Sequence, residues 1–388
     1  MSDFESDIIV IGAGMAGSAV AAHLSQHLRV QLLEMEAHPG YHSTGRSAAL
    51  FTETYGNAVI RALTRASRNF FFSPPPGFCE TALVRPRPVL MIAEAHQRDQ
   101  FRAHCESLDP AEPAEIISTE AALRLCPIVR PEYAAHALIS RGPADIEVHE
   151  LQQGYLRLFK ARGGRMATEA EVIGLNRRRG AWEVETRGGV YRAPTVVNAA
   201  GAWAGRLGAL AGAQDIGMVP CRRTAVLIDG PAGVDTHDWP VLWDLAEQFY
   251  LKPDAGLLLL SPADETPVEP GDAQPDELDI AIAVDRLETA TTLEVRHIRR
   301  KWAGLRSFVS DRSPVVGYDA RQPGFFWLAA LGGYGIQTAP ALSELAARLV
   351  LAQAPGDNTE RFGIDAAMID PARLLAGQPS QATAAART

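Results

Sequence analysis

The sequence predicts an α/β first domain with a Rossmann-like sheet and an α+β second domain whose sheet is mainly antiparallel. Three observations support this fold class: a glycine-rich turn between a strand and a helix near the start, later strands separated by glycine- and proline-rich breaks, and a length of 388 residues. Single hydrophobic cores stop growing at about 250 to 300 residues, so this length favours two domains.

The first predicted unit is a strand, a turn, a helix and a second strand. Residues 7–11 form an apolar strand, Gly12–Gly17 form the turn, an alanine-rich helix continues to about Leu28, and Arg29–Glu34 form the next strand. This β–α–β opening is typical of a Rossmann-like domain.

The later elements follow from periodicity and from breaks. Proline-dense stretches at 74–76 and 86–88 indicate that the chain leaves the first domain there. The remaining pattern predicts a helix over 147–162, strands over 171–197 with a hairpin at Gly188–Gly189, strands over 224–260, a loop over 262–279, a helix over 287–301, a strand over 325–331 and a helix over 340–351.

The composition is that of a globular protein without a nucleic-acid partner. Hydrophobic residues make up 47% and charged residues 21% of the chain, close to ordinary globular usage. The formal net charge of -9 argues against phosphate-backbone binding, which requires a basic face. The start of the chain lacks the features of a secretory leader, and no stretch approaches about 20 continuous apolar residues. We therefore expect a cytoplasmic protein with no membrane span.

Neither cysteine nor histidine indicates a metal site. The four cysteines are widely spaced and form no paired motif, as expected of reduced structural thiols. His23 and His27 have the i, i+4 spacing of some metal ligands, but the C-terminal end of a helix also favours a partial positive charge. We predict no bound metal.

The glycine turn has the spacing G-x-G-x-x-G, in which each glycine has a separate role. Gly12 allows the tight turn, Gly14 lets the backbone approach a pyrophosphate, and Gly17 permits close packing of helix on strand. The helix N-terminus is expected to hold the pyrophosphate, because its N–H groups and dipole favour anions. Glu34 is placed to accept hydrogen bonds from a ribose. Alternatively, the turn is only a tight connection and Glu34 a surface charge.

Several features favour a single flavin dinucleotide over a nicotinamide dinucleotide. Arg46 and Ser47 supply a cation and a hydroxyl soon after the second strand, suited to phosphate and ribityl contacts. The sequence has no second G-x-G-x-x-G after a strand and no redox pair of cysteines. A second strand-to-helix turn at 331–338 could bring backbone N–H groups to the flavin pyrimidine edge.

These features resemble the FAD-dependent D-amino-acid oxidase superfamily, which includes glycine and sarcosine oxidases, and within it most resemble the bacterial D-arginine dehydrogenases. The resemblance runs nearly end to end and is clearest at 40–49, 249–256, 303–308 and 332–338. It implies that a flavin domain and a substrate domain are interleaved. We accordingly assign 1–76, 140–220 and 303–376 to the FAD-binding domain, 77–139 and 221–302 to the substrate domain, and 377–388 to a mobile tail.

The glycine pattern and the resemblance together predict the FAD contacts. They are Gly12, Gly14, Met15, Ala16, Gly17, Glu34, Arg46, Ser47, Ala48, Val172, Ala200, Gly201, Trp203, Gly332, Gly335, Ile336, Gln337 and Thr338. In related sarcosine oxidases a cysteine tethers the flavin, but the matching segment 311–314 contains no cysteine. The resemblance therefore implies non-covalent FAD.

The resemblance also implies a substrate site. It assigns carboxylate binding to Arg223 and Arg306, a hydroxyl contact to Tyr250, and a carbonyl that accepts from the substrate amine to Gly333. A carboxylate in a partly dry pocket needs a fixed cation, and the planar fork of arginine donates paired hydrogen bonds. The two arginines could instead be surface charges or members of internal ion pairs.

Five further positions bear on the substrate pocket. Tyr55 and Thr52 are expected over the flavin near the substrate, although each could simply be a packed residue. Three positions depart from the arginine-specific pattern: Leu50 replaces a histidine, Val89 replaces a glutamate, and Trp243 replaces a smaller aliphatic residue. These changes remove polarity or add bulk, so a buried cationic substrate side chain would lack a partner.

We therefore predict a FAD-dependent D-amino-acid dehydrogenase or oxidase of amino-acid catabolism, acting on a neutral or hydrophobic small-molecule substrate. Hydride transfer from the α-carbon to flavin N5 would give a 2-oxo acid and ammonia. The alternatives are a FAD oxidase or dehydrogenase of glycine, N-methyl amino acids or a 2-hydroxy acid, and a non-catalytic flavin-binding protein. No motif identifies the electron acceptor.

Overall fold

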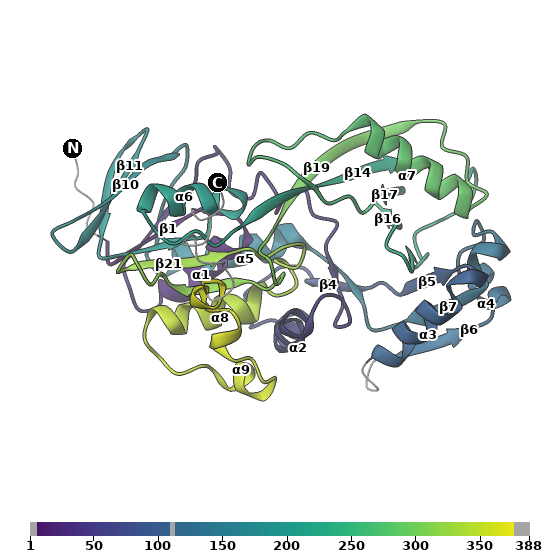
Figure 1. Ribbon diagram of the computed structural model, residues 1–388, viewed down its shortest axis with the longest axis horizontal. Helices are drawn as coiled ribbons and strands as arrows, with labels where there is room; N and C mark the ends of the chain where they lie inside the picture. Colours follow the sequence, from purple (N-terminus) through teal and green to yellow (C-terminus); the bar gives the residue numbers. More distant parts are fainter. Residues whose placement is uncertain (1–5, 109–112, 376–388) are drawn as a thin grey trace, which may run out of the picture. The chain divides into compact units, whose positions relative to one another are not determined.

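The computed structural model describes residues 6–108 and 113–375, which divide into two compact units (Figure 1). Unit 1 contains the chain up to Tyr41, Gln152–Val219, and the chain from Ser307 onward; unit 2 contains His42–Leu151 and Pro220–Arg306. Both units are assembled from separated stretches of sequence, so they are interleaved as the resemblance implied.

The bounds of these units differ from those of the predicted domains. Residues 42–76, 140–151, 220 and 303–306 were assigned to the FAD-binding domain, and they belong to unit 2. The predicted mobile tail, 377–388, lies outside the described residues.

Unit 1 is organised around a six-stranded sheet in the order β20-β21-β13-β1-β2-β9. All neighbouring strands are parallel except β20 and β21, which are antiparallel. Its elements are β1 (Ile8–Ile11), α1 (Met15–Leu24), β2 (Val30–Leu33), β9 (Arg165–Ala167), β10 (Val172–Arg178), β11 (Ala181–Thr186), β12 (Gly189–Ala193), β13 (Thr195–Asn198), α6 (Ala204–Ala211), β20 (Val315–Tyr318), β21 (Phe325–Ala329), α8 (Ala339–Val350) and α9 (Asp357–Arg361).

The local sequence explains the centre of this sheet. Every residue of β1, β2 and β21 is buried, and these strands are almost entirely apolar. Such runs are typical of parallel strands that are covered on both faces. Strands β10, β11 and β12 form a separate antiparallel sheet, and the pairing of Thr186 with Gly189 confirms the predicted hairpin. Helix α5 (Val148–Ala161) confirms the helix predicted over 147–162.

Helix α1 contains a histidine, His23, whose side chain is uncharged at neutral pH because of burial. The Nε2 atom of His23 is buried and makes no hydrogen bond within the described residues. Burial lowers the pKa of His23 to about 4; Glu344 opposes this shift, whereas Arg162 and Arg348 add to it. The ring of His23 lies 6.1 Å from that of Tyr155 on α5.

We expect this histidine to make the fold sensitive to acid. Between its ordinary pKa of 6.5 and about 4, the unfolded chain binds a proton that the folded chain does not. The free energy of unfolding should therefore fall as the pH drops through this window, by up to about 1.4 kcal/mol per pH unit, with no further loss below it. Urea unfolding of His23→Gln should show a shallower slope, whereas His27→Gln, which changes an exposed histidine, should match wild type. Equal slopes for all three proteins would contradict this assignment.

Unit 2 contains a nine-stranded, mainly antiparallel sheet in the order β18-β14-β17-β16-β15-β5-β7-β6, with β19 also paired to β14. A smaller sheet has the order β3-β8-β4. The elements are β3 (Leu50–Phe51), α2 (Ala58–Phe72), β4 (Val84–Pro86), β5 (Val89–Ala93), α3 (Arg98–Ser107), β6 (Ala114–Ile117), α4 (Thr119–Leu125), β7 (His136–Ser140), β8 (Ala144–Ile146), β14 (Val219–Ile228), β15 (Val241–Asp244), β16 (Tyr250–Asp254), β17 (Leu257–Ser261), β18 (Thr266–Pro267), α7 (Glu277–Ala290) and β19 (Ile298–Phe308). Figure 1 shows α3 and α4 beside β5, β7 and β6.

The large sheet separates a hydrophobic core from a more polar face. Leu242 pairs with Leu251, and both lie in the core together with Leu90. Because side chains alternate along a strand, the neighbouring pair of Trp243 and Tyr250 projects from the opposite face. We call this second face the site face.

The helix predicted over 287–301 is wrong in position. The helix is α7, which begins after Asp276, whose side chain accepts a hydrogen bond from the backbone N–H of Leu278 at 2.9 Å. This N-cap and the acidic residues of the first turn favour a helix start within the acidic stretch that was predicted to be a loop. Residues 298–308 form β19 instead, because they pair with β14.

Among the helices that the structure describes, none is both long and apolar enough to span a bilayer.

Candidate active site

The predicted dinucleotide turn lies at the carboxyl end of β1, directly beside β13. Gly12 has a φ of +99°, and a Cβ atom there would lie 2.6 Å from the backbone oxygen of Ala199. A Cβ atom on Gly17 would lie 1.8 Å from the Gly12 oxygen. Both positions therefore require glycine. Gly14 caps α1 without a side-chain hydrogen bond, so the N-terminus of α1 has the backbone geometry expected of a pyrophosphate site.

Two buried side chains hold this turn in place. The carboxylate of Glu34 accepts hydrogen bonds from the backbone N–H of Ala13 at 2.7 Å and of Glu36 at 3.0 Å. The amide of Gln152 donates to the Ala13 oxygen at 2.7 Å. Glu34 thus shapes the turn as well as lying at the position predicted to contact a ribose. Sequence reasoning missed Gln152, whose only signal is a polar residue within the apolar stripe of α5.

The segment after β13 completes the switch point of the parallel sheet. Strand β1 pairs with β13 on one side and with β2 on the other, so the chain connections diverge between β1 and β13. Ligands of open α/β sheets bind at such points, at the carboxyl ends of the strands. The predicted FAD contacts Ala200, Gly201 and Trp203 lie immediately after β13, where buried Asn198 donates to the Ala204 oxygen at 2.8 Å.

The turn from β21 to α8 carries the remaining glycines. Gly332 has a φ of +56°, and a Cβ atom there would lie 2.5 Å from the Phe308 ring. Thr338 is the N-cap of α8, and its hydroxyl donates to the Tyr334 oxygen at 2.9 Å. Gly333, predicted to accept from the substrate amine, is exposed. The other predicted FAD contacts of this turn are Gly335, Ile336 and Gln337.

The other predicted FAD contacts divide between the units. Val172 begins β10 in unit 1, whereas Arg46, Ser47 and Ala48 belong to unit 2. The Arg46 guanidinium forms an ion pair with Asp272. It also donates to two backbone oxygens of unit 2, each at 3.1 Å. Its positive charge is therefore already matched within its own unit, and the predicted phosphate contact stays a prediction.

The predicted substrate residues gather on the site face of unit 2. The rings of Tyr55 and Trp243 lie 5.1 Å apart in an edge-to-face arrangement, and the rings of Trp243 and Tyr250 lie 6.1 Å apart. The Arg306 guanidinium donates a hydrogen bond to Tyr55 and lies close to Tyr250. The structure thus brings together four residues from three distant parts of the sequence: Tyr55, the neighbouring strands of Trp243 and Tyr250, and Arg306. We call them, with Arg223, the arginine–tyrosine cluster.

The two arginines of this cluster differ in their partners. Arg223 donates to the backbone oxygen of Asp264 at 2.7 Å and forms an ion pair with Glu265 at 3.1 Å. Arg306 is partly buried and forms no ion pair with a carboxylate within 6–108 and 113–375. Burial and the charge of Arg306 lower the pKa of Arg223. For Arg306, burial acts to lower the pKa, but Tyr250, Tyr55 and the negative charge of Glu265 together outweigh it, so its pKa lies above the usual range.

The predicted pocket residues lie on two sheets. Val89 is buried at the start of β5, one residue before the core residue Leu90, and therefore lies on the site face with Trp243. Leu50 is half-buried on β3, where it pairs with Asp145 of β8. Thr52 is buried, and its hydroxyl lies 3.1 Å from that of Thr54.

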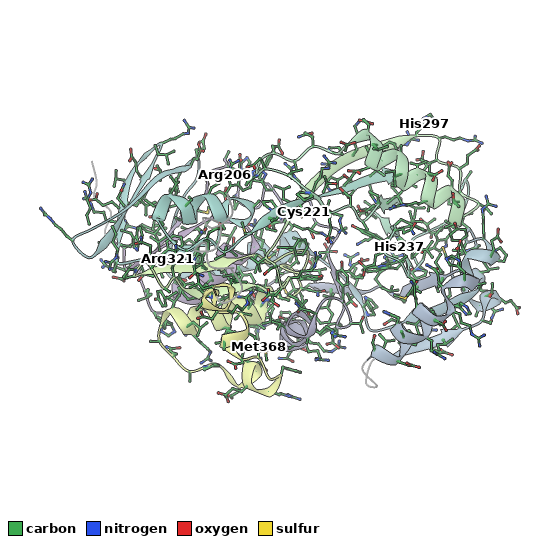
Figure 2. All side chains as sticks on the ribbon, in the orientation of Figure 1. Arg206, Cys221, His237, His297, Arg321 and Met368 are labelled. Carbon is green, nitrogen blue, oxygen red and sulfur yellow. The ribbon has the colours of Figure 1, made fainter. Side chains whose placement is uncertain are left out.

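A partly buried ion-pair network connects the small sheet to the site face. Lys252, two residues beyond Tyr250 on β16, contacts Asp145 at 2.7 Å. Arg87 contacts the same carboxylate at 2.7 Å and also donates to the backbone oxygen of His237, which is labelled in Figure 2. Sequence reasoning missed this network, because its members come from three distant segments.

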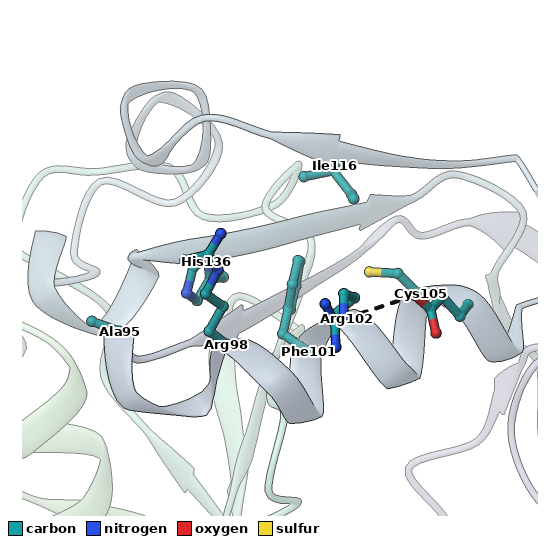
Figure 3. A pocket seen from close by; sticks show the side chains of 8 residues that line it. Ala95, Arg98, Phe101, Arg102, Cys105, Ile116 and His136 are labelled. Atoms are coloured by element: carbon teal, nitrogen blue, oxygen red, sulfur yellow. Dashed lines mark ion pairs between the residues drawn. The ribbon is translucent and has the colours of Figure 1, made fainter.

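An open pocket of about 740 Å³ lies elsewhere in unit 2, beside α3 (Figure 3). The rings of Phe101 and His136 stack there at 5.4 Å. The pocket is lined by Ala95, Arg98, Phe101, Arg102, Cys105, Glu106, Ile116 and His136. None of the predicted site residues lines it. The part of the chain that the structure describes contains no group of three or more His, Cys, Asp or Glu side chains arranged to hold a metal.

A glycine turn of the dinucleotide-binding type on a parallel sheet and a cluster of arginines and aromatic residues on an antiparallel sheet are the arrangement expected of an oxidoreductase that uses a bound dinucleotide. Residues 7–349 match the family described as FAD dependent oxidoreductase (DAO). The chain belongs to this family, and FAD is its cofactor.

Relatives of known function agree with this assignment. The glycine oxidase of Geobacillus kaustophilus is 23% identical over 366 residues, which cover 89% of this chain and 92% of that protein. The mitochondrial dimethylglycine dehydrogenase of Mus musculus is 25% identical over 360 residues, which cover 85% of this chain but 40% of the mouse protein. These relatives support the family and do not single out the D-arginine dehydrogenases within it.

Solved structures share the fold. The crystal structure of the Geobacillus kaustophilus glycine oxidase has a TM-score of 0.78 at 20% identity and covers 93% of this chain and 98% of its own. The L-proline dehydrogenase of P. horikoshii has a TM-score of 0.77 at 20% identity, with 96% and 99% covered. The predicted combination of a Rossmann-like sheet and a mainly antiparallel substrate sheet is therefore confirmed.

Proposed function

We propose that this protein is a FAD-dependent D-amino-acid dehydrogenase or oxidase that acts on neutral or hydrophobic side chains. The proposal rests on one observation, which is the environment of the Arg306 guanidinium. This group is partly buried beside two phenols and forms no ion pair with a carboxylate in the described parts of the chain. The carboxylate of an amino acid would supply that anion through paired, charge-assisted hydrogen bonds.

The roles of the other residues follow from this anchor. Tyr55 and Tyr250 flank the anchor and orient the substrate carboxylate, and the carbonyl of Gly333 accepts from the amine. FAD supplies the two-electron acceptor. Loss of a proton from the amine and of a hydride from the α-carbon leaves an imino acid, which water hydrolyses to a 2-oxo acid and ammonia. Catalysis then depends mainly on positioning, which can contribute several kcal/mol to lowering the barrier.

The proposed side-chain preference rests on Leu50, Val89 and Trp243. Val89 and Trp243 share the site face, and neither supplies a negative charge. Glu53, the nearest acidic residue in sequence to Tyr55, forms an ion pair with Arg68 at 3.3 Å. A cationic substrate side chain would lack an acidic partner at these positions, whereas each methylene group buried contributes about 0.8 kcal/mol.

A substrate panel read by anaerobic bleaching of the flavin tests this proposal. We expect D-leucine, D-methionine and D-phenylalanine to reduce the flavin more efficiently than D-arginine and D-lysine, with the L-enantiomers poor. Ammonia should form in proportion to the flavin reduced. A tenfold or greater preference for D-arginine, about 1.4 kcal/mol, would contradict the assignment of these pocket residues. No reduction by any amino acid would favour a non-catalytic flavin-binding protein.

The Val89→Glu variant extends this test to a single position. A carboxylate at the start of β5 should shift the preference toward D-arginine and D-lysine, because a cationic side chain would gain a partner. Val89→Gln adds the same bulk without charge and is the matched control. An equal shift in both variants would show that size, and not charge, determines the preference.

A second candidate is oxidation of glycine or an N-methyl glycine. The relatives named glycine oxidase and dimethylglycine dehydrogenase favour it. The edge-to-face contact of Tyr55 with Trp243 also leaves bulky side chains on the site face, which suits a small substrate. Glycine and sarcosine therefore belong in the same panel. Sarcosine yields methylamine if its α-carbon is oxidised, whereas glycine and D-amino acids both yield ammonia, so the rates of flavin reduction by glycine and by the larger D-amino acids separate those two outcomes.

A further inference from the structure

Glu265 lies directly opposite Arg223 in the large sheet. Strand β18 pairs with β14 so that Cys221 faces Pro267 and Arg222 faces Thr266. One step further along this antiparallel register, residue 265 faces residue 223. The contact of 3.1 Å between the Arg223 guanidinium and the Glu265 carboxylate is thus set by strand register, not by a chance surface encounter.

The surroundings make this ion pair more than a surface contact. The Arg223 side chain is 10% exposed and that of Glu265 is 32% exposed. Arg223 also donates to the Asp264 backbone oxygen, and the Asp264 carboxylate accepts from the backbone N–H of Thr224 at 2.7 Å. The loop before β18 therefore holds Arg223 from two sides. Pairs that are partly withdrawn from water are screened less than exposed ones.

The charge balance of the cluster depends on three side chains, because the nearby Asp264 carboxylate pairs with Arg222 at 3.8 Å and accepts from the Thr224 N–H, whereas Glu265 acts on both Arg223 and Arg306. Arg223 and Arg306 contribute two positive charges, and Glu265 contributes one negative charge. The net charge of one matches a single substrate carboxylate. A second carboxylate on the substrate would find Arg223 already paired and would be repelled by Glu265.

We propose that Glu265 is a specificity-determining residue that reserves the site for monocarboxylates by neutralising Arg223. This inference rests on the proposed carboxylate-binding role of Arg306. Removing the Glu265 charge makes Arg223 available to a second anionic group. Acidic amino acids and other dicarboxylates should then bind better relative to monocarboxylates.

The test compares the binding of propionate and succinate to the oxidised holoenzyme, followed by the change in flavin absorbance. In Glu265→Gln, the ratio of the succinate to the propionate dissociation constant should fall at least tenfold from its wild-type value. Glu265→Asp keeps the charge and should retain most of the wild-type ratio. In Glu265→Gln, the efficiency of flavin reduction by D-glutamate relative to that by D-leucine should rise by a similar factor.

The Asp229→Asn variant is the matched control. Asp229 follows β14 and pairs with Arg299 of β19 at 2.9 Å, so this substitution removes one carboxylate from an exposed arginine on the strand that also carries Arg306. This variant should leave the ratio unchanged. Glu265→Ala provides a second removal of the charge and should reproduce the change of Glu265→Gln, with FAD content and melting temperature measured for both.

The outcomes separate this inference from the proposed function. If propionate binds to wild type in competition with substrate but the ratio is unchanged in Glu265→Gln and Glu265→Ala, the role of Glu265 is overturned while the carboxylate anchor stands. If neither acid binds to wild type, the carboxylate site itself is wrong. A fall in the ratio for Asp229→Asn equal to that for Glu265→Gln would also overturn the role of Glu265.

Discussion

Alanine at position 12 is expected to abolish FAD binding. Gly12 has a φ of +99°, which an L-residue adopts only at a cost of about 1 to 2 kcal/mol, and the added methyl group would lie 2.6 Å from the backbone oxygen of Ala199. Forced overpacking against backbone typically costs about 1 to 3 kcal/mol more. The turn must move, and its backbone then no longer fits a pyrophosphate. The ratio of flavin to protein absorbance after purification measures the effect.

Gly180 provides the control for this prediction. It has a φ of +85° in the turn between β10 and β11, and a Cβ atom there would meet nothing within 4 Å. Gly180→Ala therefore carries the conformational cost without the collision and should retain FAD. If Gly12→Ala also keeps a full complement of FAD, the turn does not hold the cofactor as described.

The start of unit 1 was predictable because its signals are local. The glycine spacing, the buried strand before it and the alanine-rich helix after it all lie within residues 7–34. Each signal describes backbone geometry that neighbouring residues determine, such as the positive φ of Gly12. The structure accordingly matches the predicted elements there to within a few residues at each boundary.

Unit 2 was less predictable because its organisation depends on pairing between distant strands. Residues 298–308 have a sequence compatible with a helix, and their pairing with β14 decides in favour of a strand. Helix α2 was missed although Asn57 caps it, with its side chain accepting from the Ile60 N–H at 3.0 Å. Its hydrophobic face became recognisable only when the residues that it buries were known.

In the arginine–tyrosine cluster, too, some features could be predicted from the sequence and others depend on the pairing of distant strands. The resemblance to a known family predicted roles for Arg223, Arg306, Tyr250 and Tyr55 one by one. It did not identify the partner of Arg223, because the register that sets Glu265 opposite Arg223 is a property of the assembled sheet. The sequence left open whether each arginine was an anchor or a member of an ion pair. The 3.1 Å contact of Arg223 with Glu265 gives that arginine a carboxylate partner in the protein, whereas the role of Arg306 as a substrate anchor stays a proposal.

Replacing Arg306 by alanine is expected to lower the efficiency of flavin reduction roughly 30- to 4,000-fold while FAD remains bound. Loss of one member of a desolvated, hydrogen-bonded charge pair costs about 2 to 5 kcal/mol, and each 1.4 kcal/mol corresponds to a factor of ten. Stopped-flow measurement of flavin reduction by the best substrate, under anaerobic conditions, gives the size of this loss. Arg306→Lys should recover only part of the loss, because an ammonium group lacks the planar fork that donates two parallel hydrogen bonds to a carboxylate.

Arg299→Ala is the control, because Arg299 lies on the same strand and forms an exposed ion pair with Asp229. The flavin of this variant should be reduced by the substrate at the wild-type rate. The loss in Arg306→Ala should also be accompanied by weaker competition from propionate, since the same guanidinium is expected to bind both carboxylates. Unchanged reduction and unchanged propionate binding in Arg306→Ala would remove Arg306 from the substrate site, and with it the observation on which the proposed oxidation of an amino acid rests.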